Sequence, residues 1–142
     1  MIIENLNTIP IFIDLDADEL KDVSESCTPR KYPKNSMIIL EEEFGDIVFI
    51  IIQGTVKITR VNDEGKEVIL SLLGPGEIFG EMAILDGEPR SADATAIEDC
   101  ILFKINQRDF SQVLSIQNGV MISIIKILTK RLRETTQKVY SN

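Results

Sequence analysis

Between Tyr32 and Ile105 the chain is a series of short β-branched runs, and this pattern constrains the possible folds more than any other feature. The runs are MIIL (37–40), IVFIII (47–52), TVKITRV (55–61), EVILSLL (67–73) and TAIEDCILFKI (95–105). Glycine-bearing turns divide this region at 44–46, 53–54, 62–66, 74–76 and 86–89. Short strands at this spacing are typical of a sandwich or barrel-like roll. We therefore expect a mainly β fold.

Helical patterns flank the β region on both sides. Asp16 is placed to cap an N-terminal helix, and Glu19, three residues on, completes the sequence pattern of a capping box. Asn106 precedes a short helical pattern in the same way, with Asp109 at the third helical position. A longer helix is expected to follow over about 119–140.

Apolar residues recur along this last helix at alternating intervals of four and three, which is a heptad seam. The seam consists of Met121, Ile125, Leu128, Leu132, Thr135 and Val139. A second apolar row consists of Val120, Ile124 and Ile127. The helix could pack one face on its own roll, or the seam could pair with its copy in a homodimer. We favour the dimer, with the second row packed on the roll.

The length of 142 residues, with 44% hydrophobic residues, fits one domain that can bury a core. No linker divides the chain, so we expect a single domain over 1–142. Its helical N-terminal part would cover about 4–28, the β-roll about 30–105 and the C-terminal helices about 107–140.

The charge and the apolar pattern exclude several classes of partner. A net charge of −8 disfavours binding of these residues to nucleic acid or to anionic lipid. The longest strongly apolar run, 47–52, is too short to cross a bilayer as a helix. The start of the chain has no basic leader. We expect a soluble, cytoplasmic protein with no membrane contact.

The chain contains no histidine, and this absence removes many kinds of chemistry. Histidine-ligated haem, histidine-containing zinc sites and nucleophiles activated by histidine all lose a required group. Cys27 and Cys100 stand alone and are expected to be small buried hydrophobic residues. We therefore expect no metal, no catalytic residue and no enzymatic activity.

One stretch, FGEMAILDGEPRSADATA (79–96), combines four carboxylates with a single base, Arg90. The segment 81–85 is long enough for about one helical turn, whose first amides suit an anion. Arg90 lies across the following turn and could offer a planar fork to a phosphate, while Gly80 lets backbone approach a ligand. Glu81 could hold a sugar hydroxyl. The alternative is that Glu81 and Arg90 form only a surface ion pair.

This stretch resembles the phosphate-binding cassette of the cyclic-nucleotide-binding domain family. The family pattern is FGE, an aliphatic residue, Ala or Gly, a short variable turn, and then Arg followed by Ser, Thr or Ala. The resemblance extends through the segments 10–20, 32–46, 50–58 and 72–81 and on through the final helix. Asn35 and Glu43 stand where relatives often have glycine. The resemblance thus covers nearly the whole chain.

The resemblance implies an eight-stranded jelly roll with a flanking N-terminal helix and a long C-terminal dimerisation helix. It places the ribose 2′-hydroxyl on Glu81. It places the cyclic phosphate on Arg90 and Ser91, assisted by backbone amides near Gly80, Met82 and Ala83.

The end of the last helix, KRLRETTQKV (130–139), is similar to that of bacterial Crp/Fnr regulators of the cAMP receptor protein type. In those regulators a Thr-Ser pair meets the adenine from the two subunits of a dimer, and Thr135 and Thr136 fall on that pair. The alternative is that threonine is only tolerated near a helix end. Arg133 could lie near the base or pair with an acid such as Glu134.

The resemblance therefore implies a domain of a Crp/Fnr-type transcriptional regulator that senses cAMP, or alternatively cGMP. Ligand binding would be coupled to a homodimer formed through the 119–140 helix. Such regulators carry a helix-turn-helix domain after this helix, so DNA contact is expected only through a domain absent from these residues. The alternatives are a stand-alone cyclic-nucleotide module acting on a protein partner, and a degenerate family member that binds no nucleotide.

Overall fold

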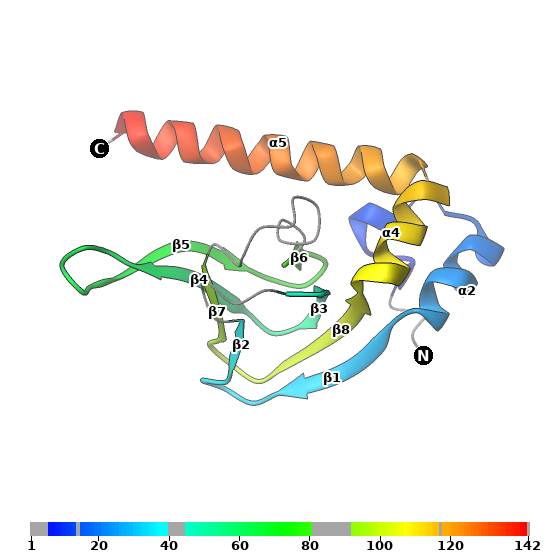
Figure 1. The fold of residues 1–142 in the computed structure, drawn as a ribbon, viewed down its shortest axis with the longest axis horizontal. Coiled ribbons are helices and arrows are strands. Elements are labelled where there is room, and N and C mark those ends of the chain that lie inside the picture. The colour runs from blue at the N-terminus through cyan, green and yellow to red at the C-terminus, as the bar shows by residue number, and fades with distance from the viewer. Residues whose placement is uncertain (1–5, 14, 40–44, 81–91, 117, 142) are drawn as a thin grey trace.

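Two four-stranded antiparallel sheets form the body of the molecule, as Figure 1 shows for this computed structural model. The structure describes residues 6–13, 15–39, 45–80, 92–116 and 118–141. One sheet has the order β1-β8-β3-β6 and the other the order β2-β7-β4-β5. The strands are β1 (Thr28–Tyr32), β2 (Met37–Ile39), β3 (Ile47–Gln53), β4 (Val56–Val61), β5 (Glu67–Leu73), β6 (Ile78–Phe79), β7 (Asp93–Ala96) and β8 (Cys100–Asn106). The predicted mainly β fold is confirmed.

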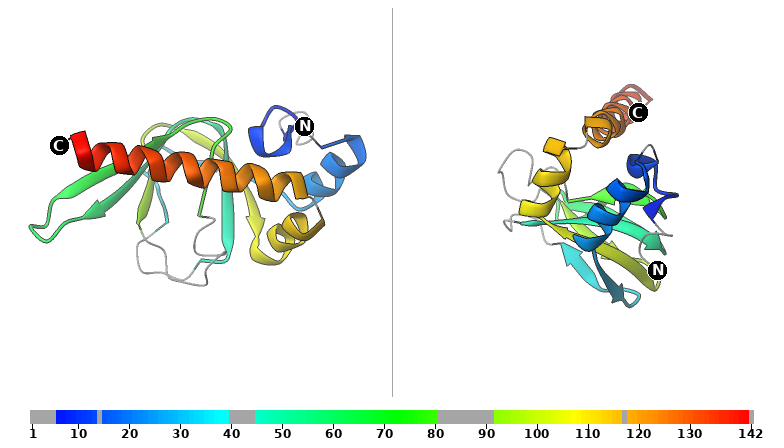
Figure 2. Two further views of the ribbon diagram at one scale, coloured as in Figure 1. Left: turned by 90° about the horizontal axis from the view of Figure 1, so that it is seen from above. Right: turned by 90° about the vertical axis from the view of Figure 1, so that its right-hand side faces the viewer.

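The helices lie outside the sheets. Those within the described residues are the short 3-10 helix η1 (Pro10–Phe12) and the α-helices α2 (Ala17–Glu25), α4 (Gln107–Ile116) and α5 (Asn118–Ser141). Seen from above, α5 runs along the length of the roll (Figure 2). Helices η1, α2 and α4 lie near the N-terminal end of α5. No helix in the described ranges is long and apolar enough to span a membrane.

Both helix caps predicted from the sequence are confirmed. The Asp16 carboxylate accepts a hydrogen bond from the Glu19 amide at 2.9 Å, and the Glu19 side chain accepts from the Asp16 amide at 3.0 Å. The Asn106 side chain accepts from the Asp109 amide at 2.9 Å. Each cap satisfies an amide at the start of a helix that has no partner within the helix.

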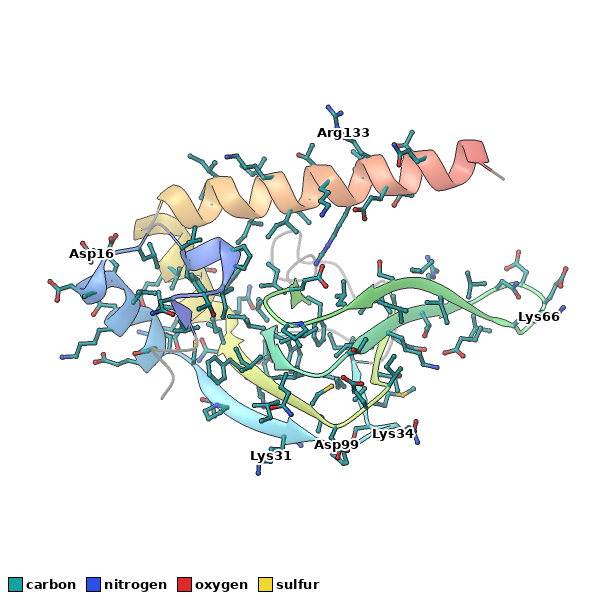
Figure 3. The ribbon with its side chains drawn as sticks, turned by 180° about the vertical axis from the view of Figure 1, so that it is seen from behind. Asp16, Lys31, Lys34, Lys66, Asp99 and Arg133 are labelled. Carbon is teal, nitrogen blue, oxygen red and sulfur yellow. The ribbon has the colours of Figure 1, made fainter. Side chains whose placement is uncertain are left out.

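The strand pattern was only partly predicted. The run 95–105, which reads as one strand, is divided into β7 and β8 by the residues 97–99. The Asp99 carboxylate in this break accepts from the Lys34 amide at 2.9 Å, and both residues are labelled in Figure 3. Strands β1 and β6 had no sequence signal of their own. Four of the five side chains of β1 are exposed, and β6 has only two residues.

The core consists of two clusters that share the central strands of one sheet. Val48 and Ile50 of β3 pack against the helices, together with buried side chains such as Phe12 and Phe110. Phe49 and Ile51 of the same strand point the other way, into the roll. Because β3 is buried on both faces, its sequence is a continuous apolar run without alternation.

Strands β4 and β5 form a hairpin that extends away from the helical end of the molecule (Figure 1). Its turn was predicted at 62–66, and the Asn62 side chain there accepts from the amides of Glu64 and Lys66, each at 3.0 Å. An ion pair of 2.9 Å joins Lys57 to Glu67 across the two strands. Large apolar side chains remain exposed on the hairpin: Val61, Val68, Ile69, Leu70 and Leu72.

Candidate functional site

The predicted ligand contacts fall into two groups with respect to the structure. Gly80, Thr135 and Thr136 lie within the described residues. The others lie outside them: Glu81, Met82, Ala83, Arg90 and Ser91. The structure therefore describes the residues on either side of the segment 81–91 and the helix α5 that carries the two threonines.

The chain enters the cassette through a tight turn at 74–77 and then through β6. The Gly74 amide donates to the Glu77 carboxylate at 2.6 Å, and the Gly76 amide donates to the Ile51 carbonyl at 2.7 Å. The Ile51 amide donates back to the Glu77 carbonyl at 2.9 Å. Gly76 has a φ of 87°, a conformation that favours glycine. These bonds hold the turn against β3, and β6 begins directly after it.

Aromatic packing holds β6 from the inside of the roll. The rings of Phe49 and Phe79 are stacked, with centroids 5.0 Å apart, and Tyr32 meets Phe49 edge-on at 6.4 Å. Phe79 and Phe49 are also register partners in the β3–β6 ladder. Gly80, the next residue, has a φ of 86°. The chain therefore turns into the cassette at a residue whose backbone conformation disfavours any side chain.

The chain leaves the cassette into the other sheet. Strand β7 begins at Asp93, which pairs with Thr59 of β4, and its alanines Ala94 and Ala96 are buried. Since β6 and β7 belong to different sheets, the segment 81–91 connects the two sheets.

Helix α5 carries the two threonines predicted to meet a base. Thr135 and Thr136 are exposed, and their hydroxyls donate to the carbonyls of Arg131 and Leu132, each at 3.0 Å. Each hydroxyl thus uses its proton within the helix and keeps its lone pairs for a donor from outside. Arg133 lies on the outer side of the helix and points away from the sheets (Figure 3), which disfavours a contact with a base.

The seam predicted along α5 is only partly exposed. Met121, Ile125 and Leu132 are exposed, as a partner-facing row would be in a single chain. Leu128 instead packs against the core of its own chain, together with Ile127. In the second row, Ile124 is buried in the core and Ile127 is partly buried against it. These two positions agree with the prediction that this row faces the roll.

Sequence reasoning missed one contact beside the site. The Arg131 guanidinium donates from Nη2 to the backbone carbonyl of Ile78 at 2.6 Å, which joins α5 to β6. The signal was present in the sequence, because position 131 is seven residues after Ile124 and so lies on the roll-facing side of the helix. An arginine on such a face requires an acceptor from the body of the protein.

Neither cysteine adds chemistry to the site. Burial, with a smaller contribution from the nearby Asp109 carboxylate, raises the pKa of the Cys27 thiol to about 12. Burial also raises the pKa of the Cys100 thiol, although its hydrogen bond to the Thr55 carbonyl opposes this effect. Both thiols therefore stay neutral near pH 7. Across the described ranges, no three Cys, Asp or Glu side chains gather as a metal site would require.

A cavity of about 340 Å³ lies between η1, the end of β3 and the turn at 74–77. It is lined by Thr8, Ile9, Pro10, Ile51, Ile52, Pro75 and Gly76. None of the described residues that line it is a predicted ligand contact or carries a charge, so this described lining offers a phosphate no cation.

Comparison with known proteins agrees with this geometry. Residues 29–117 match the family described as cyclic nucleotide-binding domain. The chain is 34% identical over 125 residues to the cyclic AMP receptor protein of Thermus thermophilus. The aligned residues cover 88% of this chain and 58% of that protein. The chain thus spans little more than half the length of this curated relative.

Solved structures have the same fold. The crystal structure of the Thermus thermophilus catabolite activator protein superposes with a TM-score of 0.82 at 32% identity, covering 92% of this chain and 61% of that one. The regulatory domain of Toxoplasma gondii PKA, crystallised with cAMP, superposes with a TM-score of 0.71 at 27% identity, covering 79% of this chain and 42% of that one. The eight strands in two sheets, with the helices outside them, match the β-roll of these structures. The chain belongs to the cyclic nucleotide-binding domain family.

Proposed function

We propose that this chain is the cAMP-sensing domain of a bacterial Crp/Fnr-type transcriptional regulator that acts in the cytoplasm. The observation that carries the choice of ligand is the pair of exposed hydroxyls on α5. Thr135 and Thr136 both donate to helix carbonyls, so both present acceptors to the outside. Adenine has a donor amino group at position 6, whereas guanine has an acceptor oxygen there. This pattern favours cAMP over cGMP.

The phosphate and ribose belong to the cassette in this proposal. Arg90 and Ser91 hold the cyclic phosphate, and backbone amides near Gly80, Met82 and Ala83 assist. Glu81 accepts from the ribose 2′-hydroxyl. The support is the family match, which includes all of these positions, and the positive φ of Gly80 at the entrance. An arginine fork and backbone amides can bind an anion even in a chain of net charge −8, because their attraction acts at short range.

Signalling in this proposal passes through a homodimer formed by α5. Exposed apolar side chains on that helix, Met121, Ile125 and Leu132, provide the surface for a second copy. A nucleotide held between the cassette and the threonines would favour one arrangement of the paired helices over another, which is a population shift. Binding to DNA would belong to a further domain and not to these residues.

A second candidate is a cyclic-nucleotide module that regulates a protein partner by direct contact. The likeness to the regulatory domain of Toxoplasma gondii PKA favours it, because that structure has the same fold in a different regulatory setting. Reading the coding sequence beyond Asn142 separates the two candidates. A helix-turn-helix domain there supports the regulator, and its absence supports the protein-directed module.

Calorimetric titration tests the proposed ligand. We expect heat from cAMP with a stoichiometry of one nucleotide per chain, and weaker binding of cGMP. A thermal-unfolding scan with each nucleotide serves as an independent readout, since a ligand that binds only the folded state raises the melting temperature. Absence of both heat and a thermal shift with either nucleotide would support the degenerate, non-binding alternative instead.

A further inference from the structure

The cavity between η1 and the turn at 74–77 has two walls that come from separate parts of the fold. Pro10 belongs to η1, whereas Pro75 and Gly76 belong to the turn before β6. A Cβ atom added to Gly76 would lie 3.4 Å from the Pro10 Cδ atom, so the two walls meet at one end of the cavity. A molecule bound in the remaining volume would contact both walls at once.

The cavity is open to solvent at its rim and closed beneath. Pro10 and Pro75 are exposed and belong to the rim, and Ile52 between them and the core is half-buried. Ile9 and Ile51 are 2% and 0% exposed, so they form a packed base. A ligand can therefore enter without opening the core, and the side chains that it would cover are mostly aliphatic.

The backbone groups at the base of the cavity are already paired. The Ile9 amide donates to the Leu6 carbonyl at 3.1 Å, and the Ile9 carbonyl accepts from the Phe12 amide at 2.9 Å. The amide and the carbonyl of Ile51 are both paired with the turn at 74–77. A firmly held water needs about two to four polar partners. Water at this base is therefore weakly held, and an apolar molecule can displace it at little cost.

The volume and the lining of the cavity indicate the kind of molecule that it would hold. An apolar cavity of about 150 Å³ is large enough for one benzene molecule. The volume of about 340 Å³ in this chain is roughly twice as large, which suits a molecule with two fused rings. Because its described lining includes no charged side chain, a charged ligand would lose hydration without gaining a partner.

We propose that this cavity is a binding site for an uncharged, apolar molecule with two fused rings. The site is separate from the proposed nucleotide site, since none of its described lining residues is a predicted contact of the nucleotide. The bound molecule joins η1 to the roll. Because η1 also contacts α5, this molecule strengthens the attachment of the N-terminal part of the chain to both.

The first test uses indole as the probe, because indole is uncharged, has two fused rings and is fluorescent. The chain contains no tryptophan, so the emission of indole can be followed without a tryptophan background. We expect saturable binding with a Kd of about 1 mM or lower, and emission at shorter wavelength as indole leaves water. Indole should also raise the melting temperature, because it binds only the folded chain.

Nuclear magnetic resonance identifies where indole binds on the parent chain. We expect the largest changes in amide chemical shift at Ile9, Ile52 and Gly76, which line the cavity. Changes confined to α5 or to residues 78–80 would overturn the proposal, because indole would then bind elsewhere. No nucleotide is used in these measurements, so their outcome is independent of the proposed function.

A matched pair of variants tests the cavity itself. Thr8→Phe adds a ring to a lining residue and should weaken the binding of indole at least about tenfold. Asn7→Phe adds the same ring to the exposed neighbour, which is not among the described lining residues, and should change Kd less than about twofold. If circular dichroism shows that Thr8→Phe is unfolded, the amide shifts of the parent decide alone. Absence of saturable binding to the parent, or equal affinity of the parent and a folded Thr8→Phe, would overturn the proposal.

Discussion

The rings of Phe49 and Phe79 stack at 5.0 Å with an angle of 12° between their planes, and this pair holds the strand that leads into the cassette. Both side chains are buried, at 4% and 3% exposure. We expect Phe79→Ala and Phe49→Ala each to lower the free energy of unfolding by about 3–5 kcal/mol. In a double-mutant cycle the coupling between them should be about 0.5–1.5 kcal/mol. Additive losses in denaturant titrations would show that the stacking contributes nothing beyond burial.

Gly54 lies where no side chain fits. Its φ is 98°, and an added Cβ would approach the Cys100 sulfur at 2.6 Å and the Asp99 carbonyl oxygen at 2.7 Å. Gly65 has a similar φ of 79° but open space around it. We expect Gly65→Ala to cost about 1–2 kcal/mol from backbone conformation alone, and Gly54→Ala to cost more. Equal melting temperatures for the two variants would contradict the steric part of this account.

The Cys27 thiol should be inert in the folded protein. Its side chain is 7% exposed, and burial raises its pKa to about 12. At pH 8 only about one thiol in ten thousand would be ionised, so Ellman's reagent should react slowly until guanidinium unfolds the chain. The unfolded thiol ionises near pH 9.0, so burial of the neutral form costs stability only as pH rises above that value. Rapid labelling of the native protein at pH 8 would refute this prediction.

The exposed face of α5 should mediate self-association. Leu132 is 68% exposed, and a carboxylate there would have to be desolvated in a paired-helix interface. We expect Leu132→Glu to raise the dimer dissociation constant by at least about tenfold in sedimentation equilibrium. Lys126→Glu, exposed on a different side of the helix, is the matched control and should leave the constant nearly unchanged. A parent chain that is monomeric at all concentrations would rule out the α5 dimer.

Elements with strong local signals were predictable from the sequence. The caps at Asp16 and Asn106 and the turn at Asn62 each depend on a side chain bonding to backbone a few residues away. Such interactions are local, so residue type and spacing are enough to identify them. Resemblance to the family supplied the count of eight strands, which is confirmed.

Elements defined by long-range contacts were not predictable in the same way. Strand β6 consists of two residues whose strand conformation depends on pairing with β3. The bond from Arg131 to Ile78 joins positions far apart in the chain, so periodicity could indicate only the face and not the acceptor. For the same reason Leu128 was assigned to the partner-facing seam, although it packs on its own core.

The most direct test of the account is the affinity of cAMP for three chains titrated in parallel. The parent should bind, and Arg90→Ala should bind about one to two decades more weakly, because it removes a charge-assisted contact of about 1.5–3 kcal/mol. Arg108→Ala, an exposed arginine at the start of α4, is the control for loss of one positive charge and should bind like the parent. If the parent gives no heat, or if Arg90→Ala binds cAMP as tightly as the parent, the proposed phosphate site is wrong.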